Sequence, residues 1–168
     1  MTDRPLWAPW RIEYVTGPKD GECIFCAAAA SSRADAPDAP IDRTEDCITI
    51  LNTFPYAPGH VMVAPIRHVA TLEDLDEDEM LDTMRLARRS ILAIRAAMNP
   101  DGFNVGLNLG KVAGAGIADH LHLHVVPRWN GDTNFMSVVG NTRVLPEDLG
   151  ETARRLRPIF ERLAAEDP

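Results

Sequence analysis

Short apolar runs, and apolar residues alternating with polar ones, occur in four segments separated by glycine, proline and asparagine, a pattern typical of β-strands. The predicted strands are residues 47–51, 61–64, 103–109 and 120–127. After the second strand, apolar side chains recur at the spacing of a helix with one buried face: Met80, Met84, Ala87, Ile91 and Ile94. Because Asp76 can cap such a helix and a turn-forming Asn-Pro-Asp-Gly follows it, a long helix is predicted from Asp76 to about Met98.

The rest of the chain completes the predicted architecture. Residues 1–20, which contain several prolines and tryptophans, predict an extended arm, and residues 31–42, rich in Ser, Ala, Pro and Asp, predict a flexible loop. A last helix is predicted over residues 146–165, in which Pro158 should cause a kink or an early end. Because the strands follow one another through short turns, the expected fold class is α+β. One domain over residues 1–168 should hold an antiparallel sheet packed with the long helix and the C-terminal helix.

Composition limits the function without specifying it. The chain has 168 residues, 45% of them hydrophobic and 25% charged, which suits one domain with its own core. The net charge of −8 argues against binding to nucleic acid or to an anionic membrane. A small phosphate ligand is compatible with that charge, since backbone N–H groups can hold an anion on an acidic protein. No apolar run approaches the roughly 18 residues of a membrane span and no apolar leader is visible, so a cytoplasmic protein is expected.

Two charged groups belong to the predicted long helix. The acidic run of residues 73–79 is expected to complement the positive end of the helix dipole. Later in the helix, Arg85, Arg88, Arg89 and Arg95 are expected to form a solvated face. Neither group indicates a binding site.

Three of the five histidines lie within five residues, at His120, His122 and His124. In a strand, residues two apart share a face, so the three imidazoles should point the same way at intervals of about 6.6 Å. Ordinary strand histidines are one interpretation, and a three-histidine metal site is another. A third interpretation is phosphate chemistry, because the glycine-rich segment 108–116 could direct backbone N–H groups at an anion beside the imidazoles.

The three cysteines fall into a pair and a single residue. Cys23 and Cys26 form a Cys-x-x-Cys motif, which is compatible with half of a zinc site, a redox pair or two buried thiols. A redox pair usually begins a helix after a strand in a βαβ unit, and no such unit is predicted here. Cys47 lies on an apolar strand and is expected to be a core thiol.

The histidine cluster resembles a known family. His120-Leu-His122-Leu-His124-Val-Val fills every position of the histidine-triad motif, so the chain is identified as a member of the histidine-triad (HIT) family, with a HIT-like fold. Residues 52–65 are similar to the family's ribose-side strand pair, and Asn108 to its phosphate-side asparagine. Residues 6–11 and 128–135 resemble the Fhit-like branch, which cleaves diadenosine polyphosphates.

The resemblance implies a nucleotidyl-histidine mechanism. His122, in the middle of the triad, would attack the α-phosphorus and carry the nucleoside monophosphate, while His124 would stabilise the phosphate charge and assist the leaving group. His120 completes the catalytic triad, and Asn52 would bind the ribose hydroxyls. The remaining residues implied in phosphate binding are Asn108, Gly114, Ala115, Gly116 and again His124. Many relatives carry a polar residue that contacts phosphate just before the triad, whereas this chain has Gly116-Ile117 there.

The resemblance also implies a cofactor and partners. A structural Zn²⁺ would be held by four residues: Cys23, Cys26, His68 and His120. The expected substrate is an adenine mono- or dinucleotide, which would be cleaved by phosphorolysis with orthophosphate as the acceptor. The protein is expected to be a homodimer. The alternatives are a hydrolase of dinucleoside polyphosphates or nucleoside phosphoramidates, and a nucleotide-binding protein with weak catalysis.

Overall fold

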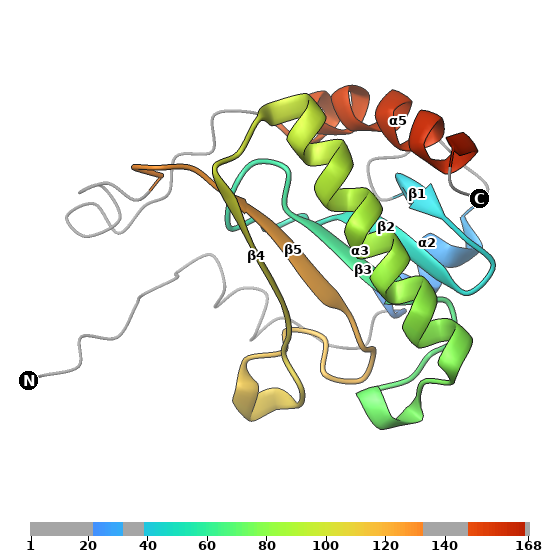
Figure 1. The fold of residues 1–168 in the computed structure, drawn as a ribbon. Coiled ribbons are helices and arrows are strands. Elements are labelled where there is room, and N and C mark those ends of the chain that lie inside the picture. Colours follow the sequence, from blue (N-terminus) through green and yellow to red (C-terminus); the bar gives the residue numbers. More distant parts are fainter. Residues whose placement is uncertain (1–21, 32–38, 133–147, 167–168) are drawn as a thin grey trace, which may run out of the picture.

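The computed structural model describes residues 22–31, 39–132 and 148–166, and within these residues the chain forms one antiparallel sheet between helices (Figure 1). The sheet has the order β1-β2-β3-β5-β4. Its strands are β1 (Asp42–Arg43), β2 (Cys47–Leu51), β3 (Val61–Pro65), β4 (Gly102–Leu107) and β5 (Leu123–Arg128). The helices are α2 (Ile24–Ala30), α3 (Glu77–Met98) and α5 (Leu149–Glu166), with short 3₁₀ turns η1 (Leu72–Asp74) and η2 (Lys111–Ala113).

Both faces of the middle of the sheet are covered, so β2 and β3 are buried along their whole length. Cys47, Val61 and Val63 belong to the main core, which α3 and α5 complete on one face. Ile48 and Met62 belong to a second buried cluster, with Phe25 and Ala28 of α2. The candidate site lies on the face of the sheet that this second cluster covers, beside α2.

The long helix follows its sequence signals. The side chain of Asp76 accepts from the backbone N–H of Glu79, and the side chain of Glu79 accepts from the backbone N–H of Asp76, which is a complete capping box. The helix ends at Met98, because Asn99 adopts a left-handed conformation. The prediction of a helix from Asp76 to about Met98 is therefore confirmed. The prediction that four arginines of this helix form a solvated face is wrong for Arg89. This side chain is buried and pairs with Asp42 of β1 at 3.2 Å.

The sequence prediction is wrong at two strand boundaries. The triad strand was expected from residue 120, but β5 begins at Leu123, so His120 lies outside the strand. The third predicted strand ends two residues early, at Leu107. The last helix ends at Glu166, one residue beyond the predicted end, so Pro158 does not cause an early end; Leu156 and Phe160, on either side of it, are fully buried in the core.

Other predicted segments are only partly described. Residues 1–20, 146–147 and most of the predicted loop 31–42 lie outside the described residues, although Asp42 itself opens β1. In the part of the chain that is described, no helix is long and apolar enough to cross a membrane.

Replacing Glu79 with glutamine is expected to destabilise the fold by about 1–2 kcal/mol at pH 7, because its buried carboxylate accepts two hydrogen bonds from the half-exposed Arg67. Hydrogen bonding to Arg67 lowers the pKa of Glu79. Its contribution is therefore complete above the unfolded-state pKa of about 4.3 and is lost as the pH falls through the lower folded-state pKa. Urea unfolding at pH 7 and pH 3 measures this, and the difference between the two proteins should shrink at pH 3. The same change at exposed Glu77 should leave stability unaltered.

Candidate active site and metal site

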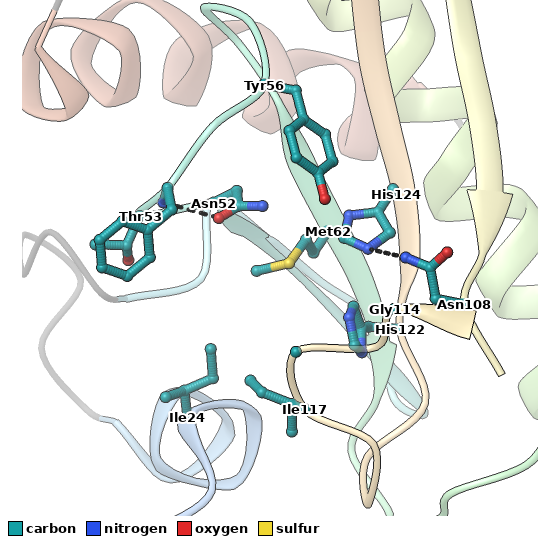
Figure 2. A pocket seen from close by; sticks show the side chains of 12 residues that line it. Ile24, Asn52, Thr53, Tyr56, Met62, Asn108, Gly114, Ile117, His122 and His124 are labelled. Carbon is teal, nitrogen blue, oxygen red and sulfur yellow. Dashed lines mark hydrogen bonds between the residues drawn. The ribbon is translucent and has the colours of Figure 1, made fainter. Parts of the chain in front are cut away.

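A pocket of about 310 Å³ opens on the α2 face of the sheet, where the chain leaves β2 and β4 and enters β5 (Figure 2). Six of the residues singled out in the sequence line it: Asn52, Asn108, Gly114, Gly116, His122 and His124. Ala115 and His120 are not among the lining residues. The pocket therefore brings together the second and third triad histidines and separates the first from them.

His122 is buried and held in one protonation form. Its Nδ1 lies 2.8 Å from the backbone oxygen of His120. A carbonyl oxygen only accepts, so Nδ1 carries the proton and Nε2 keeps a free lone pair. Burial lowers the pKa of His122, which favours the neutral ring near pH 7. The geometry thus gives His122 an unprotonated Nε2 in the pocket wall.

His124 has the opposite arrangement, which depends on His60, a residue to which the sequence analysis gave no role. His60 is 1% exposed, and its Nδ1 accepts from the backbone N–H of Tyr56 at 3.1 Å. The proton of His60 is therefore on Nε2, which donates to Nδ1 of His124 at 2.9 Å. His124 consequently carries its own proton on Nε2. The amide nitrogen of Asn108 lies 3.4 Å from that atom (Figure 2). Turning the amide by 180° exchanges its nitrogen and oxygen, and the oxygen then accepts from Nε2 of His124.

The signal that could have identified His60 is its position relative to its neighbours. Met62 of β3 is paired with His124 of β5, and His60 shares the face of Met62 because the two are two residues apart. The sequence alone did not show that β3 and β5 are neighbours, so this histidine could not be placed beside the triad.

The glycine loop between β4 and β5 passes the pocket at Gly114 and Gly116. Gly110 and Gly114 have φ angles of 79° and 90°, which a side chain would strain. Three of its backbone N–H groups already donate inside the loop: Gly114 donates to the oxygen of Lys111 at 3.0 Å, and Ala113 and Ala115 donate to the oxygen of Gly110 at 3.2 Å and 3.4 Å. The loop therefore places backbone near His122, with Gly116 nearest to the triad in the chain.

The first triad histidine joins a separate cluster. Cys23, Cys26, His68 and His120 offer four ligand atoms that all lie within 4.8 Å of one another. Zinc–ligand bonds of about 2.0–2.3 Å in a tetrahedron separate ligand atoms by roughly 3.3–3.8 Å. Nδ1 of His120 is 3.2 Å from Sγ of Cys23, 3.7 Å from Sγ of Cys26 and 3.2 Å from Nδ1 of His68, so the set is already close to that size.

The protonation of His120 also fits a metal ligand. Its Nε2 donates to the backbone oxygen of Pro65 at 2.9 Å, which leaves the lone pair of Nδ1 facing the cluster. Burial lowers the pKa of His120 and favours the neutral imidazole that metals bind. A two-cysteine, two-histidine set with this orientation fits a structural zinc.

The Cys-x-x-Cys motif does begin a helix, since Cys23 is the N-cap of α2. The redox interpretation expected such a helix, but the two histidines beside the thiols favour the metal-binding interpretation over the redox one. Cys47 is not part of the cluster and is fully buried in the main core, as predicted.

Comparison with known proteins identifies the family. The HIT domain family matches residues 33–131, and the chain belongs to the HIT family. Over 164 residues it is 40% identical to a Mycobacterium tuberculosis protein named AP-4-A phosphorylase, covering 94% of this chain and 84% of that relative. This identity extends well beyond the family's shared domain.

Solved structures confirm the predicted α+β HIT fold. A zinc-bound histidine triad family protein from Mycobacterium smegmatis has a TM-score of 0.67 at 31% identity, covering 87% of this chain and 98% of that chain. The Plasmodium falciparum diadenosine triphosphate hydrolase has a TM-score of 0.61 at 17% identity, covering 94% and 96%. The second similarity concerns the fold alone.

Proposed function

We propose that this chain is an enzyme that binds adenine nucleotides and cleaves diadenosine polyphosphates, such as diadenosine tetraphosphate, at the α-phosphate. The observation that carries the proposal is a pair of imidazoles in one pocket, their ring centroids 4.9 Å apart. His122 offers an unprotonated Nε2, and beside it His124 offers a protonated one. The similarity to a relative named AP-4-A phosphorylase supports this substrate class.

In the first step, Nε2 of His122 attacks the α-phosphorus. A phosphorus–nitrogen bond forms, and the bond from the α-phosphorus to the bridging oxygen of the leaving nucleotide breaks. The Nε2–H of His124 donates a hydrogen bond to that oxygen and stabilises the negative charge that develops on it, and the leaving nucleotide departs as a phosphate anion. In the second step, an anionic oxygen of orthophosphate attacks the phosphorus of nucleotidyl-His122, the phosphorus–nitrogen bond breaks, and its electron pair returns to Nε2 of His122, while His124 again donates a hydrogen bond to the phosphate oxygens.

The nucleoside half of the substrate fits the apolar end of the pocket. Ile24, Phe54, Tyr56 and Ile117 line it, which suits the flat faces of an adenine. Asn52, at the end of the buried β2, would meet the ribose hydroxyls. Its side-chain oxygen accepts from the backbone N–H of Phe54 at 2.9 Å, which fixes the amide in the pocket wall.

Phosphorolysis is tested by incubating the protein with diadenosine tetraphosphate, with and without orthophosphate, and identifying the products. ADP and ATP that appear only with orthophosphate are the expected result, because orthophosphate would take the adenylyl group from His122. AMP and ATP would instead make the protein a hydrolase that uses the same intermediate. Two ADP would require attack away from the α-phosphate and would contradict the mechanism. No turnover would favour a nucleotide-binding protein.

Replacing His60 with phenylalanine is expected to lower kcat about 10- to 100-fold, because His124 then loses the donor that fixes its proton on Nε2. This is the size of effect found when a residue that orients a metal-ligating histidine is removed. Glutamine at position 60, which keeps an N–H donor, should retain more activity. Steady-state kinetics of both variants measure this, and an unchanged kcat in the phenylalanine variant would show that His124 needs no such partner.

We further propose that the cluster of Cys23, Cys26, His68 and His120 holds a structural Zn²⁺. Such an ion would fix the orientation of His120, and none of the proposed steps passes through it. His120 thus supports the triad from outside the pocket. The thiol ligands require a reducing compartment, so the location we propose is the cytoplasm.

We propose that the protein is a homodimer joined at the outer edge of β4, the last strand of the sheet (Figure 1). An edge strand has unpaired backbone groups that a second copy can pair. Val105, in the middle of this strand, is an apolar side chain left 44% exposed. Val105→Glu is expected to convert the dimer to a monomer, as measured by sedimentation, whereas Val112→Glu on the exposed η2 turn should not. A wild-type protein that sediments as a monomer would refute the dimer.

A further inference from the structure

One short helix connects the metal cluster to the pocket. Helix α2 has seven residues and is preceded by its N-cap, Cys23. Cys23 and Cys26 belong to the metal cluster, and Ile24 lines the pocket. A helix of seven residues is not stable by itself in water. Its position on the sheet must therefore come from its contacts, and Phe25 is the side chain of α2 that is fully buried.

The ring of Phe25 lies against two triad histidines. Its centroid is 4.9 Å from that of His122, with the planes inclined by 30°, and 5.0 Å from that of His120, with the planes inclined by 45°. Phe25 therefore contacts the proposed nucleophile and a proposed metal ligand with one rigid side chain.

Hydrogen bonds restrain the ring of His122 less than that of His124. Among the described residues, His122 makes one hydrogen bond, from Nδ1 to the oxygen of His120, which restrains one ring atom but leaves the ring able to swing about that bond. His124 differs, because His60 and Asn108 hold its two nitrogens from opposite sides. A stacked aromatic ring supplies the restraint on His122 that hydrogen bonds supply for His124.

We propose that Phe25 is a positioning residue that holds the His122 imidazole in the plane from which Nε2 faces the pocket, and that ligation at Cys23 and Cys26 holds Phe25 in place. This inference rests on the proposed function of His122. It explains why the cluster and the pocket share a helix: the metal ligands anchor α2, and α2 aligns the nucleophile.

The test replaces Phe25 with leucine, which keeps an apolar side chain but removes the flat ring. Phe160→Leu is the matched control, because Phe160 is equally buried, lies on α5, and belongs to the core on the other face of the sheet. Both variants should unfold at lower temperature than the wild type. Phe25→Leu is expected to lose kcat about tenfold with KM changed less than twofold, since a small misplacement of a reacting group has effects of this order. Phe160→Leu should keep kcat within twofold.

Two further measurements separate this role from simple damage to the fold. Metal content, measured by elemental analysis, should stay the same in Phe25→Leu. In nuclear magnetic resonance spectra, the ring protons of His122 should lose the upfield shift caused by a stacked phenyl ring, in Phe25→Leu only. This second readout does not need turnover, so it still tests the stacking if the proposed enzymatic function fails. An unchanged kcat and unchanged His122 signals in Phe25→Leu would overturn the proposal, as would equal losses of kcat in both variants.

Discussion

His122→Ala is expected to abolish the cleavage of diadenosine tetraphosphate, with a loss of at least about 10⁴-fold in kcat. The proposed reaction proceeds through a bond to Nε2 of this residue, and nucleophile replacements in well-studied hydrolases cost up to about 10⁶-fold. His124 cannot substitute for it, because the hydrogen bond from His60 places the proton of His124 on the nitrogen that faces the pocket. Product formation measured by chromatography gives the rate.

Two controls make this result specific. His122→Ala should remain folded but melt at a lower temperature than the wild type, since the change removes a buried ring that stacks on Phe25. His122→Gly should regain some activity when imidazole is added, because the added ring can enter the space against Phe25 and attack in place of the side chain. In the wild type, acid-free quenching followed by mass spectrometry should find an adenylyl group on His122. Full activity of His122→Ala would refute the mechanism.

Cys26→Ser is expected to weaken metal binding about 100-fold and to lower the melting temperature in proportion. Structural sites bind Zn²⁺ with a free energy of about 10–16 kcal/mol. One of four ligands then contributes roughly 3 kcal/mol, which corresponds to a factor of about 100 in the dissociation constant. The wild type, purified without chelator, should contain one zinc ion per chain and lose stability when a strong chelator removes it.

Cys47→Ser is the matched control for the metal site. Burial raises the pKa of the Cys47 thiol to about 11, so it stays protonated, and it lies against Thr83 and not against the cluster. This variant should keep its zinc. A wild-type protein that is free of metal and melts at the same temperature with and without chelator would refute the structural zinc.

The parts of the fold that could be predicted from the sequence have local signals. The bounds of α3 follow from Asp76, from the helical spacing of its apolar residues and from the turn after Met98. Strand β2 was predicted with its observed bounds, and β3 to within one residue, because a strand buried on both faces is a short, continuous apolar run.

The parts that were missed depend on contacts between distant segments. Alternation placed His120 in the triad strand, but its side chain is directed toward Cys23, which lies 97 residues earlier, and the strand begins only at Leu123. Arg89 looks like its exposed neighbours until β1 brings Asp42 against it. Helix α2 has no strong start signal, because its N-cap is a cysteine whose side chain makes no capping hydrogen bond.

The candidate site also has residues that local sequence signals predict and a residue that depends on contacts between distant segments. The residue types and spacing of the triad were enough to predict a nucleophile and its neighbour, and the pocket does contain His122, His124, Asn52 and Asn108. The contribution of His60 was not predictable, since it arises from the pairing of β3 with β5, which local patterns do not encode.

The proton on Nδ1 of His122 is held by the main chain of His120 and not by a side chain. In enzymes where an aspartate orients the reacting histidine, a single substitution of the aspartate removes that partner, and the loss of activity identifies it. Here every amino acid at position 120 would still carry the carbonyl oxygen. A survey of all single substitutions should therefore identify the nucleophile but find no acidic residue paired with it, because this partner is part of the path of the backbone.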